Sequence, residues 1–307
     1  MKFFNKLFLT LLILSSFKSI SQDLEPRFLS SLPIKSNIAG VIYSYSTGNI
    51  LMDNSLPIED LNSDMHSGTI VYVRSFSLFN KLAKFDFNLS YSNAQFNALV
   101  EDSAQETTRT GIGDPNFRVS IILIGDEPLE ASKFGQRKIS KFKLGVALKT
   151  RIPIGQYDNS KLINLGSNRF GFHFKTAAAY RISPKLIIEG HVSSWFFTTN
   201  NSFYADNKLW QEPLLSTQLN TAYIFNPKTW ASVAIGAVFF GQTHLNELKQ
   251  ENHQNNSRYS FTFSRRIGKK GSLKFIATNG LSTNIGTDFT SYLLGYQFLW
   301  LDKTKKL

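Results

Sequence analysis

The sequence predicts an all-β fold: a single antiparallel transmembrane β-barrel of about 12 strands, preceded by a cleaved N-terminal signal peptide. Three observations predict it. Apolar and polar residues alternate one for one in many segments, these segments are longer than ordinary strands, and tight turns between them alternate with longer loops. The chain has 307 residues, 42% of them hydrophobic, and no cysteine, so neither disulfides nor thiolate metal sites arise.

The first 21 residues have the features of a secretory signal peptide. Lys2 and Lys6 precede a short apolar run, and Ser19 and Ser21 supply the small residues before a cleavage site. A membrane anchor is the alternative, but the run is much shorter than the roughly 20 apolar residues of a spanning helix. We therefore expect a signal peptide at 1–21, a periplasmic lead segment at 22–36, an outer-membrane barrel at 37–302 and a basic periplasmic tail at 303–307.

The charge balance is basic. The whole chain carries a formal net charge of +12, and loss of the three lysines of the signal peptide leaves +9. In a cytoplasmic protein this balance would suggest nucleic acid. In an exported chain, anionic lipid headgroups or anionic solutes are better candidates, and lysine-rich turns are the simplest explanation, so we expect no nucleic-acid partner.

The stretch KFDFNLSYS at 84–92 illustrates the alternation. Phe85, Phe87, Leu89 and Tyr91 fall on one face of a strand, and polar residues fall on the other. The same period, with two less regular stretches at 68–79 and 271–284, recurs along the chain. In order, the expected strands span about 38–50, 68–79, 84–97, 112–124, 142–155, 168–181, 186–199, 210–225, 229–243, 257–267, 271–284 and 288–301.

Each of the regular strands has its own apolar face. These faces should meet lipid, while the intervening polar residues should face the lumen. In chain order after KFDFNLSYS, the best-marked faces are formed by Phe117, Val119 and Ile121; Leu144, Val146 and Leu148; Phe170, Phe172 and Phe174; Leu186, Ile188 and Val192; Leu215, Leu219 and Tyr223; Val233 and Ile235; Tyr259, Phe261 and Phe263; and Tyr292, Leu294 and Tyr296.

The connections between strands give an independent test. Every second one is a tight turn: NKLA, ISPK, NPKT and GKKG. The others are mostly long and polar, as external loops of outer-membrane barrels are. The exception is DEPLEASKFGQRKIS at 126–140. The alternation requires a tight turn here, but the connection is long, so we expect it to form a small periplasmic helix or a flexible loop. A secreted β-sandwich is the soluble alternative, but sandwiches rarely hold so many strands of this length.

Two glycine-containing motifs stand at the middle of the chain. GIGDP at 111–115 opens a strand and lacks the lysine of a phosphate-binding loop, and RIPIGQY at 151–157 follows the next strand. Together with the amphipathic hairpins and the aromatic last strand, they resemble the outer-membrane proteins grouped as the putative phenol-degradation meta-pathway family. The resemblance covers roughly 37–301, with its specific part at 111–215. It implies an outer-membrane barrel that admits hydrophobic or aromatic compounds. The tail DKTKKL departs from the usual terminal aromatic residue, which is displaced to Phe298 or Trp300.

The predicted lumen face is unusually basic. Charged residues should face the lumen, because a cation on the lipid side at mid-bilayer costs about 2–4 kcal/mol. Two interpretations remain open: a constriction that attracts anions, or a network of ion pairs that plugs a narrow barrel. The candidate lumen-lining residues are Asp114, Arg118, Lys143, Lys149, Arg151, His173, Lys175, Arg181, Glu189 and His191.

Enzymatic and ligand-stacking alternatives rest on a few residues. A lipid hydrolase needs a nucleophile and a histidine at the lipid-facing surface, but His173 and His191 fall on the lumen face, and Ser193 lies about 7 Å along the strand from His191. His173, Glu189 and His191 lack the close spacing of metal ligands, so we expect no metal and no cofactor. An aromatic cluster should form part of the interfacial girdle, with ligand stacking as the alternative: Trp195, Phe196, Phe197 and Trp210.

These observations predict a function as well as a fold. We expect a passive channel or transporter for small, hydrophobic or aromatic solutes rather than an enzyme. The alternatives are a non-conducting structural or adhesin-type barrel and, less in keeping with the residues, a lipid hydrolase. The expected partners are outer-membrane lipid, a small-molecule solute and the barrel-assembly machinery.

Overall fold

The computed structural model describes residues 24–51 and 58–302, so the predicted signal peptide and basic tail lie outside the described residues. The elements, in chain order, are β1 (Ser36–Leu51), β2 (Ile58–Leu78), β3 (Lys81–Val100), β4 (Ser103–Ile112), β5 (Asn116–Ile124), α2 (Ala131–Phe134), β6 (Phe142–Arg151), β7 (Gly171–Arg181), β8 (Leu186–Phe197), β9 (Asn200–Phe203), β10 (Asn207–Gln211), β11 (Leu214–Asn226), β12 (Thr229–Phe240), β13 (Thr243–Leu245), β14 (Leu248–Lys249), β15 (Gln254–Ile267), β16 (Gly271–Ser282) and β17 (Gly286–Leu301).

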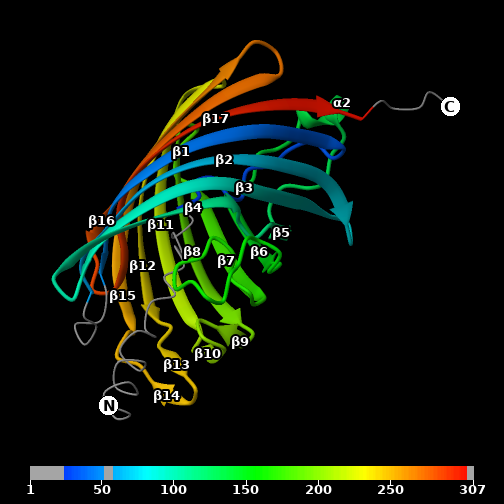
Figure 1. Cartoon of the computed structure of the whole chain (residues 1–307). Helices are drawn as coiled ribbons and strands as arrows, with labels where there is room; N and C mark the ends of the chain where they lie inside the picture. Colours follow the sequence, from blue (N-terminus) through cyan, green and yellow to red (C-terminus); the bar gives the residue numbers. More distant parts are fainter. Residues whose placement is uncertain (1–23, 52–57, 303–307) are drawn as a thin grey trace.

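One antiparallel sheet curls round and closes on itself (Figure 1). β1 pairs with β17 along its whole length, and β2 pairs with β3. β4 and β5 both pair with β3 and are two halves of one interrupted wall strand. The wall therefore has 12 strands, which confirms the predicted fold class. Closure pairs the backbone groups that an open edge would leave unsatisfied in hydrocarbon.

The predicted alternation separates the two surfaces of the wall. In β15, Tyr259 and Phe261 are 48% and 43% exposed on the outside, whereas Ser260 and Thr262 between and beyond them are 3% and 0% exposed inside. The outer surface of the other strands is likewise apolar, as for Tyr91 in KFDFNLSYS. Because this apolar surface surrounds a polar interior, the wall suits a bilayer rather than water.

The barrel has two different ends. Both ends of the barrel chain and the tight turns at 79–80, 182–185, 227–228 and 268–270 lie at one end, which we call the turn end. Phe79 and Asn80 have φ angles of 49° and 56°, the left-handed values of a two-residue hairpin turn. The opposite end, which we call the loop end, carries a second, four-stranded sheet made of β9, β10, β13 and β14 (Figure 1).

Three wall strands extend further at the loop end than the sequence indicates. Their polar composition predicts loops in NSLPIEDLNSDMH at 54–66 and EDSAQETTRT at 101–110, but most of these residues belong to β2 and β4. Asn93 and Thr110, on the outer face of this extension, hydrogen-bond across the strands at 2.6 Å. Strands that stand above the hydrocarbon can be polar on their outer face, and the pattern of a lipid-facing strand is then absent.

The long connection at the turn end contains only one helical turn. α2 covers four residues, and no helix of the described residues is long and apolar enough to cross a membrane. Asp126 anchors the connection: it accepts hydrogen bonds from Ser31 Oγ, Lys143 Nζ and Ser140 N. Burial raises the pKa of Asp126, but these hydrogen bonds outweigh burial and lower the pKa to about 2.

Residues 24–34, which we call the N-terminal segment, enter the lumen at the turn end. The sequence predicts a periplasmic lead segment at 22–36, and within it Phe28 and Leu29 are buried inside the wall, at only 2% and 3% exposure. Both pack against small residues on the inner face of β6 and β7, including Ala147 and Ala177. A Cβ atom on Gly145 would lie 2.6 Å from Leu29, so the wall leaves space for this segment.

Candidate functional site

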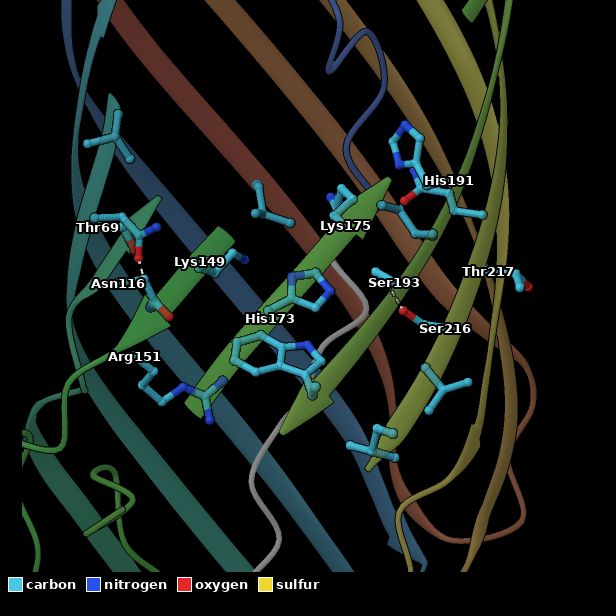
Figure 2. A pocket seen from close by; sticks show the side chains of 18 of the residues that line it. Thr69, Asn116, Lys149, Arg151, His173, Lys175, His191, Ser193, Ser216 and Thr217 are labelled. Carbon is cyan, nitrogen blue, oxygen red and sulfur yellow. Dashed lines mark hydrogen bonds between the residues drawn. The ribbon is translucent and has the colours of Figure 1, made fainter. Parts of the chain in front are cut away.

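A cavity of about 330 Å³ lies in the lumen between the N-terminal segment and the loop end. Its charged wall comes from β6 and β7, where every second side chain points inward. Figure 2 shows Lys149, Arg151, His173 and Lys175 projecting from these neighbouring strands toward the same space. Three of them are nearly buried, with Lys149 at 7% and His173 and Lys175 at 4% exposure.

Trp195, on β8, is the centre of this wall. Its indole stacks on the His173 ring with 4.5 Å between centroids and 15° between planes. The Arg151 guanidinium lies 4.9 Å and the Lys149 ammonium 5.7 Å from the indole centroid. Cations over an aromatic face are attracted by its quadrupole, most strongly where water is excluded. The indole therefore holds these cations in a fixed arrangement.

The aromatic cluster expected around Trp195 is divided by the wall. Trp195 and Phe197 face inward and stack on each other, with 5.8 Å between centroids. Phe196 is 44% exposed on the outer face, and Trp210 belongs to β10 of the second sheet. The interfacial-girdle interpretation therefore fits Phe196 but is corrected for Trp195, because odd-numbered residues of β8 face the lumen.

A second cavity, of about 300 Å³, continues from the first toward the loop end. The two share lining residues, among them Thr69, Asn116 and Arg151. A third, wider space of about 620 Å³ at the mouth shares Asn164 and Leu165 with the second. The three cavities follow one another from the loop end to Trp195, each sharing lining residues with the next; we call this series the path, and Arg151 lines both of its first two cavities.

The connection between β6 and β7, residues 152–170, folds over this path; we call it the mouth loop. Its Ile163 packs against a cluster formed by β1, β2, β3 and β17, which includes Phe96 and Phe289. Arg109 Nε donates a hydrogen bond to the Ile163 carbonyl at 2.7 Å. The mouth loop thus crosses the lumen and sets the width of its entrance.

Asp114, from GIGDP, holds both ends of the mouth loop. Its Oδ1 accepts from Gly155 N at 2.9 Å, and its Oδ2 accepts from Ser167 N at 2.8 Å. A Cβ on Gly155 would lie 2.8 Å from Asp114 N, and one on Gly166 would lie 2.6 Å from Gly155 C, so only glycines allow this approach. The two motifs noted in the sequence therefore meet here. The expected role of Asp114 as an acidic partner of the lumen cations is replaced by this contact with backbone amides.

The turn-end half of the lumen is a network of ion pairs. Arg118 donates to Asp86 Oδ1 at 3.0 Å and to Glu25 Oε1 at 2.9 Å, and Lys175 Nζ lies 3.6 Å from Glu25 Oε2. Lys143 pairs with Asp126 at 2.8 Å. The ten predicted lumen residues are thus not brought to one site: Arg118, Lys143 and Glu189 contact the N-terminal segment, whereas Arg181 lies at the turn end and donates to the Pro184 carbonyl.

Glu189 binds the N-terminal segment rather than a lumen cation. It accepts hydrogen bonds from Phe28 N at 2.8 Å and Leu29 N at 3.1 Å, and His191 Nε2 lies 2.8 Å from the same carboxylate. Lys84 Nζ donates to the Phe28 carbonyl at 2.6 Å. The sequence offered one signal for this contact, the run of small inward residues on β6 and β7, but it did not indicate which segment fills the space.

The residues on which the hydrolase and metal-site alternatives depend lie inside the barrel. Ser193 Oγ is 2.7 Å from Ser216 Oγ, and both lie in the lumen, away from lipid. Among the residues that the structure describes, no group of three His, Asp or Glu side chains is arranged to hold a metal ion.

A closed 12-stranded wall, with an apolar outer belt and a solute-sized polar lumen, defines an outer-membrane β-barrel of the porin-like class. Within that class, the chain belongs to the family described as putative MetA-pathway of phenol degradation, whose model matches residues 52–302. A comparison with curated proteins finds no match.

The chain is also similar to solved structures of outer-membrane proteins. The COG4313 outer membrane channel from Pseudomonas putida F1 matches with a TM-score of 0.74 at 17% identity, covering 90% of this chain and 99% of that chain. The transport unit of the autotransporter AIDA-I from Escherichia coli has a TM-score of 0.50 at 10% identity, with coverages of 90% and 95%. The KdgM porin has a TM-score of 0.45 at 8% identity, with coverages of 84% and 98%. At these identities the likeness concerns the fold.

Proposed function

We propose that the protein is a passive channel for small solutes in the outer membrane. The observation that carries the proposal is the series of three cavities between the loop end and Trp195, in which each cavity shares lining residues with the next. Hydrophobic or aromatic solutes are suited to it, because apolar side chains such as Ile42, Val71 and Leu293 line part of the path. Such a solute would follow its own gradient.

Export and orientation belong to the same proposal. The signal peptide directs export, the barrel-assembly machinery inserts the chain, and outer-membrane lipid surrounds its apolar belt. The turn end faces the periplasm, because barrels of this class have short periplasmic turns and long external loops. We propose no enzymatic activity.

The N-terminal segment is the obstacle on this path. It occupies the turn end below Trp195, held by Glu189 and Lys84 and packed on Ala177. This observation favours the second candidate function, a non-conducting structural barrel. Conduction requires that solute pass beside the segment or that the segment shift, and the two candidates therefore differ in what displacing Phe28 should do.

The test is to crowd Phe28 out of its site. Ala177→Leu adds bulk at a position that is 1% exposed and packed with Phe28, whereas Ala178→Leu adds the same bulk on the lipid-facing side of the same strand. Overpacking a filled core forces neighbours to move. We expect Ala177→Leu to raise single-channel conductance in planar bilayers, and Ala178→Leu to match the unaltered protein. Heat-modifiable gel mobility establishes that each variant is folded.

One result would contradict the channel, and another would contradict the role of the N-terminal segment. Silence of the unaltered protein and of a folded Ala177→Leu variant would favour the structural barrel. Equal conductance steps for Ala177→Leu and Ala178→Leu would leave a channel but remove the N-terminal segment as its obstacle.

A further inference from the structure

We propose that the lumen beside Trp195 contains a binding site for a small organic anion with an apolar body. This inference rests on the proposed function, because such a solute reaches the site only through the lumen. It concerns the 330 Å³ cavity already described, which is at the lower end of the range for sites that enclose a small ligand.

The first observation is the concentration of cations on one wall. Lys149, Arg151 and Lys175 line the cavity together with His173, and Trp195 fixes the arrangement of Lys149 and Arg151 by contact with its ring. Low-dielectric walls strengthen the field of such a cluster, and charge-assisted hydrogen bonds to a carboxylate are about twice as strong as neutral ones.

The second observation is the sign of the surroundings. The residues that line this cavity, all of them within the part of the chain that the structure describes, include no aspartate or glutamate. The turn-end half of the lumen differs, because Arg118 has Glu25 and Asp86 there, and Lys143 has Asp126. The turn-end half of the lumen therefore pairs its cations with acids, whereas the charged residues that line the cavity are all basic, and one of them, Lys175, also lies 3.6 Å from Glu25.

The third observation is the facing wall. Ile42 on β1, Val71 on β2 and Leu293 on β17 line the cavity from strands that stand across the closed sheet from β7 and β8. Leu214 and Val238 also line the cavity but pack beside Trp195, and Leu24 of the N-terminal segment forms part of the floor. A ligand that spans the cavity would have its anionic group toward Arg151 and Lys149 and its apolar body toward Ile42 and Leu293. Neither a bare inorganic anion nor a neutral hydrocarbon matches both walls.

The experiment uses benzoate, benzamide and acetate as probes. Benzamide has nearly the shape of benzoate but no charge, and acetate has the charge but almost no apolar body. Trp195 becomes the reporter when the other three tryptophans are replaced by phenylalanine: Trp210, Trp230 and Trp300. Fluorescence titrations are made on the refolded full chain in detergent at about 0.15 M salt, where exposed loop carboxylates are largely screened.

We expect saturable quenching by benzoate, with binding at least about tenfold weaker for both benzamide and acetate, since each lacks one of the two interactions. Lys149→Gln with Arg151→Gln should weaken benzoate binding by about tenfold or more and leave the weak binding of benzamide unchanged. Lys208→Gln, an exposed lysine on β10, removes a charge outside the lumen and should have no effect.

Three results would overturn the site. These are equal affinity for benzoate and benzamide, equal affinity for benzoate and acetate, and unchanged benzoate affinity in a Lys149→Gln and Arg151→Gln variant that has native heat-modifiable mobility. Bilayer conductance of the same preparations separates this proposal from the proposed function. Conductance without saturable benzoate binding removes the site and leaves the channel, whereas saturable binding in a silent barrel keeps the site and removes the channel.

Discussion

The carboxylate of Asp114 offers the most direct test of how the entrance is built. It accepts one hydrogen bond from each end of the mouth loop, at Gly155 N and Ser167 N. Asp114→Asn keeps the size of the side chain but has one acceptor oxygen instead of two, and its new NH₂ group faces an amide N–H. We therefore expect the mouth loop to open more often while the barrel wall stays folded.

The magnitude follows from the lost bond. A hydrogen bond to a charged group contributes about 1.5–3 kcal/mol, and the remaining bond is weakened when the charge is removed, so the closed loop should lose about 2–4 kcal/mol. At about 1.4 kcal/mol per factor of ten, the open population should rise roughly 30-fold to several hundred-fold.

Limited proteolysis measures this population. Arg169 is 4% exposed within the mouth loop, so trypsin can cleave after it only when the loop has opened. The control is Asp206→Asn, which removes an exposed carboxylate that accepts a single solvent-exposed bond from Asn159 Nδ2 of the same mouth loop, so it separates the loss of one surface contact from the loss of the Asp114 contacts. Cleavage after Arg169 that is equally fast in Asp114→Asn, Asp206→Asn and the unaltered protein would refute the assignment of Asp114 as the residue that holds the loop closed.

Three further predictions concern the turn end. Arg118→Gln should lower the free energy of unfolding in urea by about 3 kcal/mol, because it removes the cation between Asp86 and Glu25, for which Lys175 at 3.6 Å from Glu25 compensates only in part. Adding Glu25→Gln should recover part of the loss, and no recovery would contradict the pairing. Because the pKa of Asp126 is lowered to about 2, its contribution is complete above its ordinary pKa and is lost as the pH falls through about 2. The melting temperature of Asp126→Asn should therefore be below that of the unaltered protein at pH 7 and converge on it near pH 2, and a constant gap would be inconsistent with this pKa. Asp302→Asn removes an exposed carboxylate paired with Arg74 at 2.6 Å, so any loss of melting temperature should be small and should disappear in high salt.

The fold could be predicted because the lipid imposes one simple rule on every strand. Where a strand crosses hydrocarbon, its outer face must be apolar, and this gives the period of two seen around Tyr259 and Phe261. The rule ends where the bilayer ends. β4 and the start of β2 stand above it, and their polar outer faces read as loop although the backbone continues as strand.

The candidate site was less predictable, because its contacts join segments far apart in the sequence. The alternation places Lys149 and Lys175 inside, but it does not say that Glu25 reaches Lys175 or that Asp114 turns to Gly155. The N-terminal segment has neither a strand period nor a helical one, so it carries no local signal of its position. Only the small inward residues opposite it, such as Ala177, indicate that something occupies the lumen there.

The hydrogen-bonding and charged groups of the N-terminal segment have matching partners on the wall. The segment is therefore part of the folded barrel and does not merely precede it in the chain. Glu25 supplies a carboxylate to Arg118, Glu189 accepts the Phe28 and Leu29 amides, and Lys84 donates to the Phe28 carbonyl. Withdrawing the segment into water would leave the wall side of each contact buried without its partner, and each such group costs about 1–3 kcal/mol, more if charged. A segment held in this way stays in place in the resting barrel. A path past it must therefore either run beside Phe28 or replace these contacts with those of a solute.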